Sequence, residues 1–463
     1  MRLKSHPWAK LTTLVAVSTV TVGMAGFVAL AQAGPAAADP TVQFVAVGSD
    51  TIQDVMNQFS VDLTGNLLGS YNAVDPISGA AHGTLSYVKG ANATSPSVSC
   101  SFTRPNGSTE GLDALRASVN PTTTASQDAV PPQAGCIDIS RSSSGPTSTD
   151  VKSDGQLVYI PFAVDAVTGS VGPQTGGVVS GSTGNVTTVA TTLTGAGAPD
   201  YDFVNYLTIA ELSALYSCPV PSSTNNEGAV TVTDPLAPGG SVLVNPNVSS
   251  TFTLPAGQVQ IDLYIPQSGS GTLSFWAGQL GFSKTAPPGC DHQSIVNAGA
   301  TYNNMQVEEH NGTAVAVDPD GYFPFSIAQW LSQSHHSNID RRYGAQLQNV
   351  TNAAGTMESP CLAAGAASNC TTAGSSINAA GFPFVRYVYN ILQYDQVFSG
   401  DTSTYLPALA SMFVGSGSSL CSDGLQLFLY GFAQLPSTNP NLGDACGTIS
   451  DATLRVFDAS DPV

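Results

Sequence analysis

The sequence predicts an α/β fold, because strand-like and helix-like segments alternate along most of its 463 residues. Apolar, β-rich runs are followed by turns of Gly, Ser and Thr, and most of these turns open a segment with helical spacing of apolar residues. Hydrophobic residues make up 42% of the chain, which excludes disorder throughout and allows a sizeable core.

The first unit shows this pattern. Thr41–Val47 is expected to be a buried strand and Gly48–Thr51 a turn, and Ile52, Val55 and Phe59 are spaced for one face of a helix. A second helix start lies at 105–111. The other expected strands are 137–139, 157–167, 259–265 and 384–392, and the other expected helices are 207–216, capped by Thr208, 273–280 and 325–331. Residues 169–199 suggest a β-hairpin or a surface excursion.

Residues 1–38 have the features of an export signal. Basic residues precede an apolar run at 11–30, and small-residue patterns at 31–33 and 36–38 follow it. We expect cleavage rather than a membrane anchor, because small residues and Pro35 come directly after the apolar run. No cysteine near the cleavage region offers a lipid anchor, and no later stretch approaches the ~20 apolar residues of a membrane span. The sequence therefore predicts a secreted, extracellular protein without a stable membrane anchor.

All eight cysteines follow the cleavage region, and an even number in an exported chain predicts disulfides. Spacing does not determine their connectivity. The economical expectation pairs neighbours: Cys100–Cys136, Cys361–Cys370 and Cys421–Cys446, which leaves Cys218–Cys290. No Cys-x-x-Cys motif occurs, which disfavours a zinc site or redox catalysis.

The charge of the chain excludes some partners. After residue 38 it has 10 Lys and Arg against 32 Asp and Glu, a formal charge of −22. Nucleic acids and anionic membrane surfaces are poor partners for such a protein. A small anion is not excluded, because backbone N–H groups at helix N-termini bind anions locally.

Four segments are rich in Gly, Ser and Thr beside strand or helix ends: Gly48–Thr51, Gly107–Glu110, Ser140–Ser144 and Ser268–Thr272. In all but the third, hydroxyls lie at or just before a helix start, next to free N–H groups and the positive end of the helix dipole. A tetrahedral oxyanion needs several such donors. For each segment alone, ordinary N-capping is the favoured explanation, and the case for an anion site rests on finding four such segments in one α/β chain.

Eight motifs in this order resemble the phosphate-binding component of the ABC-type phosphate importer, a type II periplasmic binding protein, over about residues 41–392. They are VAVGSDTIQDVMNQF, RPNGSTEGLDAL, ISRSSSGP, LVYIPFAVDAVT, LTIAELSALY, QSGSGTLSFW, DPDGYFPFSIAQWL and FVRYVYNIL. The resemblance implies two lobes joined by two crossing segments, with a ligand cleft between the lobes. Lobe I would comprise 41–165 plus 385–463, and lobe II 166–384.

The resemblance also implies the residues that contact phosphate. The contacts fall on Thr51, on the backbone N–H of Ile52, on the Ser108 hydroxyl and on the cluster Ser270, Gly271 and Thr272. Ser49 and Ser142 lie beside them as further candidates.

Two positions depart from the family pattern. Arg141 stands where the family has an aspartate, and Pro266 stands where it has an arginine. We therefore expect Asp50 to accept a hydrogen bond from protonated phosphate, so that the site rejects sulfate, which carries no proton. We expect Arg141 to supply the positive charge. The alternatives are that Asp50 only caps its helix and that Arg141 is a surface side chain.

Other sites have weaker support. Glu308–His310 and His335–His336 could suggest metal ligation, but scattered histidines are more often solvated, so no metal or other cofactor is expected. No Gly-x-Ser-x-Gly elbow or phosphate loop occurs. Together with the resemblance, these observations predict a monomeric binding protein, not an enzyme, that captures inorganic phosphate or a similar tetrahedral oxyanion for ABC-type import. The alternatives are a secreted phosphoester hydrolase and an extracellular interaction protein that has lost its ligand.

Overall fold

The computed structural model describes residues 41–76, 79–120, 130–172, 177–180, 185–188, 201–222, 228–235, 237–247, 254–296, 302–363, 365–368, 370–401, 403–435 and 445–457. The predicted export signal at 1–38 lies outside these residues. None of the helices in the described part of the chain combines the length and apolar character that crossing a membrane requires.

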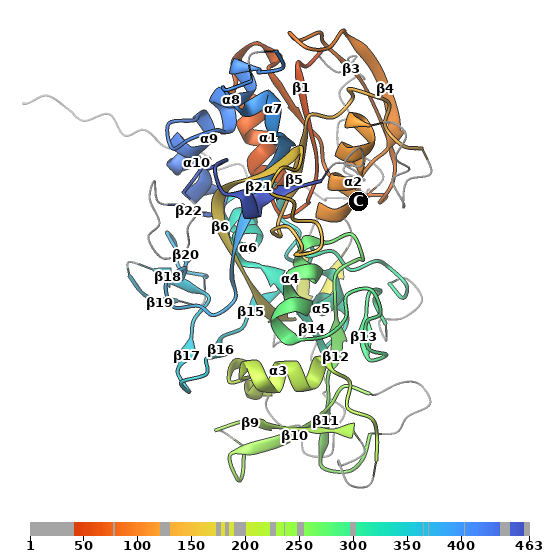
Figure 1. Cartoon of the computed structure of the whole chain (residues 1–463). Helices are drawn as coiled ribbons and strands as arrows, with labels where there is room; N and C mark the ends of the chain where they lie inside the picture. Colours follow the sequence, from red (N-terminus) through yellow and green to blue (C-terminus); the bar gives the residue numbers. More distant parts are fainter. Residues whose placement is uncertain are drawn as a thin grey trace, which may run out of the picture. The chain divides into compact units, whose positions relative to one another are not determined.

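One mixed sheet forms the centre of the structure (Figure 1), with the path β13-β12-β14-β6-β21-β5-β1-β2. Each end of this path is a group of parallel strands. The first group comprises β1 (Phe44–Gly48), β2 (Leu68–Ser70) and β5 (Ile139–Ser142), and the second comprises β12 (Asp262–Tyr264), β13 (Asp291–His292) and β14 (Gly321–Ser326).

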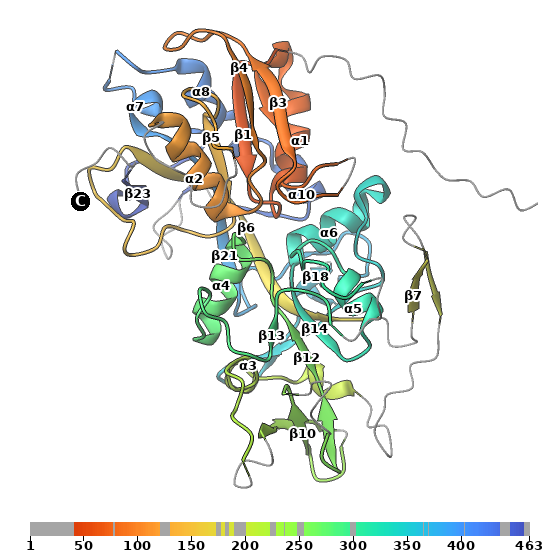
Figure 2. The same cartoon turned by 90° about the vertical axis from the view of Figure 1, so that its right-hand side faces the viewer.

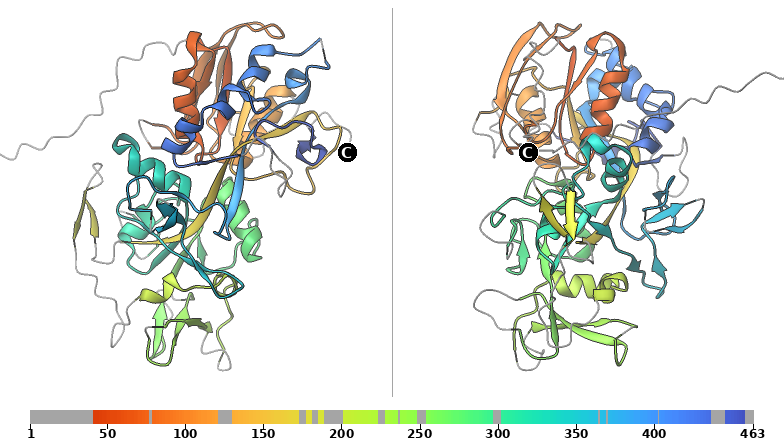
Figure 3. Two further views of the ribbon diagram at one scale, coloured as in Figure 1. Left: turned by 90° about the vertical axis from the view of Figure 1, so that its left-hand side faces the viewer. Right: turned by 180° about the vertical axis from the view of Figure 1, so that it is seen from behind.

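Two long strands join the groups. β6 (Leu157–Val171) and β21 (Val385–Gln393) pair antiparallel, and they lie side by side in every view (Figures 2 and 3). β21 also pairs with β5 of the first group, and β6 with β14 of the second. The α/β class and the two crossing segments are therefore confirmed. The lobe boundaries that the resemblance implied stay a prediction.

The main helices begin after strands and turns, as the sequence predicts. α1 (Gln53–Asp62) comes after β1 and buries Val55, Met56 and Phe59 on one face. α2 (Ser108–Val119) follows the second turn, α4 (Gly271–Leu280) follows β12, and α6 (Ile327–His335) follows β14. The expected helix at 325–331 begins only at Ile327, because Phe325 is still paired with β6.

Smaller elements surround these groups. α3 (Ile209–Tyr216) has the expected Thr208 cap, completed by Glu211 as a capping box. β7 (Gly177–Ser180) and β8 (Asn185–Thr188) form a hairpin within the segment 169–199. The strand expected at 259–265 is divided into β11 (Gln258–Gln260) and β12, which belong to different sheets.

The remaining helices and strands are short. The strands are β3 (Thr84–Lys89), β4 (Val98–Thr103), β9 (Val230–Thr233), β10 (Ser241–Asn245), β15 (Gln346–Leu347), β16 (Val350–Thr351), β17 (Met357–Glu358), β18 (Cys361–Ala363), β19 (Ala366–Ser368), β20 (Ser376–Ile377), β22 (Ala433–Gln434) and β23 (Arg455–Val456). The helices are α5 (Thr313–Val317), α7 (Tyr394–Val397), α8 (Pro407–Phe413), α9 (Ser419–Ser422) and α10 (Gly424–Leu429).

All eight cysteines form disulfides. The pairs are Cys100–Cys136, Cys218–Cys290, Cys361–Cys370 and Cys421–Cys446. Neighbour pairing is confirmed at every position.

Candidate functional site

Residues from separate turns meet where β1, α2, β5 and α4 approach one another. The hydroxyl oxygens of Thr51 and Thr272 lie 3.5 Å apart although 221 residues separate them. The Ser108 hydroxyl oxygen lies 3.3 Å from that of Ser143 and accepts a hydrogen bond from the Ser143 N–H at 3.0 Å. The structure thus brings residues of all four predicted turns into one place.

Gly271 makes this approach possible. A Cβ atom at this position would overlap the hydroxyl oxygens of both Ser108 and Ser143. Gly271 is the first residue of α4, and Ser270 caps that helix by accepting a hydrogen bond from Leu273 N–H at 3.0 Å. The first turns of α2 and α4 therefore both face the hydroxyl cluster with the positive ends of their dipoles.

The cation of the site is Arg386 on β21. It donates to the Thr272 hydroxyl oxygen at 2.8 Å through Nη2, and to Oδ2 of Asp165 at 2.7 Å and 3.0 Å through Nη2 and Nε. Its side chain is only 3% exposed, and Nη1 has no hydrogen-bond partner among the described residues. One donor of a buried guanidinium next to the hydroxyls is therefore available to a ligand.

Asp165 holds Arg386 in place. The two residues are directly opposite each other on β6 and β21. Asp165 is fully buried and also accepts hydrogen bonds from the Ser326 hydroxyl and from Ala328 N–H. This pair is absent from the sequence-based predictions. The available signal was a charged residue inside each of the apolar expected strands 157–167 and 384–392, because a charge that becomes buried requires a partner.

The hydrogen bonds of Arg141 differ from the predicted contact with the ligand. Its guanidinium donates to the carbonyl oxygens of Gly48, Ser49 and Tyr71 and to the Ser70 hydroxyl, at 2.6–3.2 Å. It is fully buried, and burial lowers its pKa to about 9, so it stays charged at neutral pH. Arg141 therefore fastens the backbone of the opening turn, and the cation beside the hydroxyls is Arg386.

Asp50 is not a helix cap. The N-cap residue of α1 is Ile52, which makes no side-chain cap bond. Asp50 accepts from Thr51 N–H at 3.0 Å through Oδ1, and its Oδ2 lies 2.6 Å from Nδ1 of His310. Burial raises the pKa of Asp50, and burial also lowers the pKa of His310 to about 3. His310 is therefore neutral at neutral pH, and it shares a hydrogen bond with the Asp50 carboxyl group. The role of Asp50 as an acceptor for phosphate stays a prediction.

Glu309 lies beneath the opening turn. Its Oε1 accepts from the Thr51 hydroxyl at 3.2 Å, and its Oε2 has no partner among the described residues. Burial, together with the charge of Asp50, raises the pKa of Glu309 to about 8. Glu309 is therefore mostly protonated at neutral pH and adds little negative charge next to the hydroxyl cluster.

Asp50, Glu308 and His310 could hold a metal ion, since one ligand atom of each lies within 4.8 Å of the others. Two of these residues are joined by the hydrogen bond described above, and Glu308 accepts from the Asn106 amide at 2.9 Å. His335 and His336, the other histidines considered, bond to the backbone carbonyls of Leu429 and Ser332. The expected absence of a metal stays a prediction.

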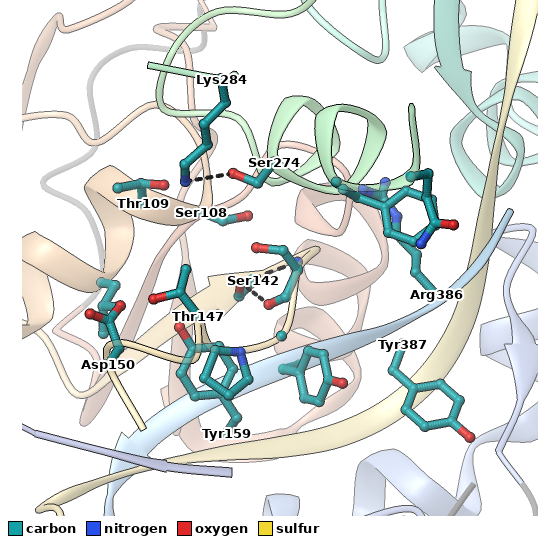
Figure 4. A pocket seen from close by; sticks show the side chains of 18 of the residues that line it. Ser108, Thr109, Ser142, Thr147, Asp150, Tyr159, Ser274, Lys284, Arg386 and Tyr387 are labelled. Atoms are coloured by element: carbon teal, nitrogen blue, oxygen red, sulfur yellow. Dashed lines mark hydrogen bonds between the residues drawn. The ribbon is translucent and has the colours of Figure 1, made fainter. Parts of the chain in front are cut away.

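The hydroxyl cluster adjoins a cavity of about 530 Å³ (Figure 4). Ser108, Ser142 and Arg386 line it, together with residues of α2, α4 and the segment after β5. The Ser142 hydroxyl donates to the Ser144 carbonyl oxygen at 2.7 Å. The Ser49 hydroxyl is fully buried, and its oxygen has no partner among the described residues.

Comparisons with known proteins give structural neighbours only. No family model and no curated protein matches the sequence. An ABC-type phosphate transport receptor from Vibrio cholerae aligns at 10% identity and a TM-score of 0.38, covering 85% of this chain and 99% of the receptor. A high affinity periplasmic phosphate-binding protein, PfluDING, solved with bound phosphate, aligns at 12% identity and a TM-score of 0.40, covering 86% of this chain and 91% of that protein. At these scores the function of this chain rests on its own residues.

Proposed function

We propose that this chain binds inorganic phosphate, or a similar tetrahedral oxyanion, between the Thr51, Ser108 and Thr272 hydroxyls and Nη1 of Arg386. The observation that supports this proposal most directly is that hydroxyls from separate turns meet beside a buried guanidinium that has an unused donor. Hydroxyls and a guanidinium are donors that suit the several oxygens of a phosphate ion. Two helix N-termini add to the local positive potential.

Binding requires the hydroxyls to separate slightly, because Thr51 and Thr272 now contact each other. The two residues follow strands of different parallel groups, which are joined by β6 and β21. A hinge motion in these strands opens the site and lets both groups contribute donors when it closes. We take the groups as the lobes 41–165 plus 385–463 and 166–384.

Within this proposal the protein binds phosphate outside the cell membrane and delivers it to an ABC permease. The resemblance of its motifs supports this role. The net charge of −22 after residue 38 does not oppose it, since the donors act at short range within a buried site. Genes for a permease and an ATPase beside this one would support the import role.

Replacing Thr272 with valine is expected to weaken phosphate binding roughly ten- to a hundredfold. The variant T272V removes a hydroxyl that donates to a charged oxygen, a hydrogen bond of about 1.5–3 kcal/mol. Calorimetric titration with orthophosphate measures the change. The control T208V removes the cap of α3, which costs about 1 kcal/mol of stability, and leaves the affinity unchanged. Equal affinities of T272V and wild type would remove this residue from the site.

A further inference from the structure

The cavity beside the hydroxyl cluster has the size of a pocket for a molecule larger than phosphate. Its volume of about 530 Å³ lies within the roughly 300–1,000 Å³ of pockets that hold organic small molecules. Three tyrosines line it, Tyr159, Tyr387 and Tyr389, with Phe275 from α4. One phosphate group bound by Arg386 and Ser108 would occupy only the margin of this space.

Three cationic side chains line the cavity, against one carboxylate, Asp150. They are Arg116, Lys284 and Arg386, three of the ten basic residues after residue 38. In a chain where acidic residues outnumber basic ones by 32 to 10, three basic residues line this one cavity. Two of them also have carboxylate neighbours, Arg386 beside Asp165 and Arg116 beside Asp113 and Asp150.

All three cations have donors to spare. Nη1 of Arg386 and Nη2 of Arg116 are buried and have no hydrogen-bond partner among the described residues. The Lys284 ammonium donates to the Ser274 hydroxyl at 2.9 Å, and no ion pair of Lys284 is found in the described part of the chain. Arg116 has acidic neighbours, Asp113 at 3.5 Å and Asp150 at 4.0 Å. In Figure 4, Lys284 lies above Ser142, and Arg386 lies to its right.

We propose that the cavity holds a second phosphate group of the same ligand, bound by Lys284 and Arg116, so that the protein captures compounds that carry two phosphate groups. This inference rests on the proposed function, since the first phosphate group occupies the hydroxyl cluster and Arg386. An ammonium and a guanidinium at the far side provide charge-assisted donors for the second group. The tyrosine side chains contact the part of the ligand that joins its two phosphate groups. Both condensed phosphates and organic bisphosphates have this chemistry.

The test compares orthophosphate, pyrophosphate and fructose 1,6-bisphosphate by calorimetric titration, without divalent cations, which would bind the condensed phosphate. We expect at least one two-phosphate ligand to bind at least tenfold more tightly than orthophosphate. The affinities of the condensed phosphate and the organic bisphosphate, compared with each other, show which of these two classes the cavity binds. The variant K284M is expected to remove this gain while changing the orthophosphate affinity less than twofold. K152M makes the same change of charge at a lysine that does not line the cavity, and should retain the gain.

Each other outcome contradicts a defined part of the account. If orthophosphate binds and neither two-phosphate ligand binds more tightly, the inference is wrong and the proposed function stands. If a gain exists but K284M and K152M behave alike, Lys284 does not bind the second group and the inference is wrong. If none of the three ligands binds, both the inference and the proposed function fail.

Discussion

Replacing Arg386 with methionine is expected to weaken phosphate binding at least a hundredfold. The variant R386M removes the unused Nη1 donor, the bond to Thr272 and the positive charge of the site. A charge-assisted hydrogen bond contributes about 1.5–3 kcal/mol. The added loss of the charge from a buried site increases the effect. Calorimetric titration with orthophosphate measures it.

The same variant is expected to destabilise the protein, because Asp165 stays buried without its partner. Breaking a buried ion pair from one side costs about 3–5 kcal/mol. The double variant D165N/R386M removes both charges and should recover much of the stability without recovering binding. The double variant therefore separates the role of Arg386 in phosphate binding from its role in stability. R386K keeps the positive charge but loses the guanidinium geometry that donates from two nitrogen atoms, so we expect a phosphate affinity between those of R386M and wild type. An affinity of R386M within threefold of wild type would contradict the assignment.

The protein is expected to become less stable as the pH rises from about 5 to 8. Burial raises the pKa of Glu309, Asp291 and Asp318 to about 8 each, with nearby carboxylates adding to the effect at Glu309 and Asp318. These carboxyl groups titrate near 4 in the unfolded chain. Between these values the folded state holds protons that the unfolded state has released. The contribution of these three groups to stability is therefore greatest at the acidic end of the window and falls as the pH rises through it, whereas His310, whose pKa is lowered to about 3, opposes this trend only below about pH 6.5.

The variant E309Q tests the contribution of Glu309. The amide cannot ionise, so the fall in stability between pH 5.5 and 8.5 should be smaller than in wild type by roughly 1–3 kcal/mol. Denaturant unfolding at a series of pH values measures it. Hydrogen bonds from Ser403 lower the pKa of Asp401, so this group is ionised in both the folded and the unfolded state throughout this pH range, and the control D401N should leave the fall in place. Identical profiles for E309Q and wild type would show that Glu309 is not protonated in the folded state.

The local parts of the site could be predicted from the sequence. The turn that precedes α4 and the cap at Ser270 follow from residue types that favour one local conformation. The apolar spacing of Val55 and Phe59 likewise predicts α1. The disulfides follow neighbour pairing, which needed no knowledge of the fold.

The long-range parts could not be predicted in this way. Arg386 and Asp165 meet because β6 and β21 pair in one particular register, and register depends on the assembled sheet. The expectation for Arg141 rests on its place in the family pattern and on the missing arginine at Pro266, and such a pattern does not show that the side chain turns back to the carbonyl oxygens of Gly48 and Ser49. Asp50 and His310 are 260 residues apart, so no local pattern joins them.

A crystal structure of the protein grown with saturating orthophosphate tests the central claim most directly. The account predicts a tetrahedral anion within hydrogen-bonding distance of the Thr51, Ser108 and Thr272 hydroxyls and of Nη1 of Arg386. Crystals in which these groups bond only to one another, or in which the anion lies at a different place, would contradict it.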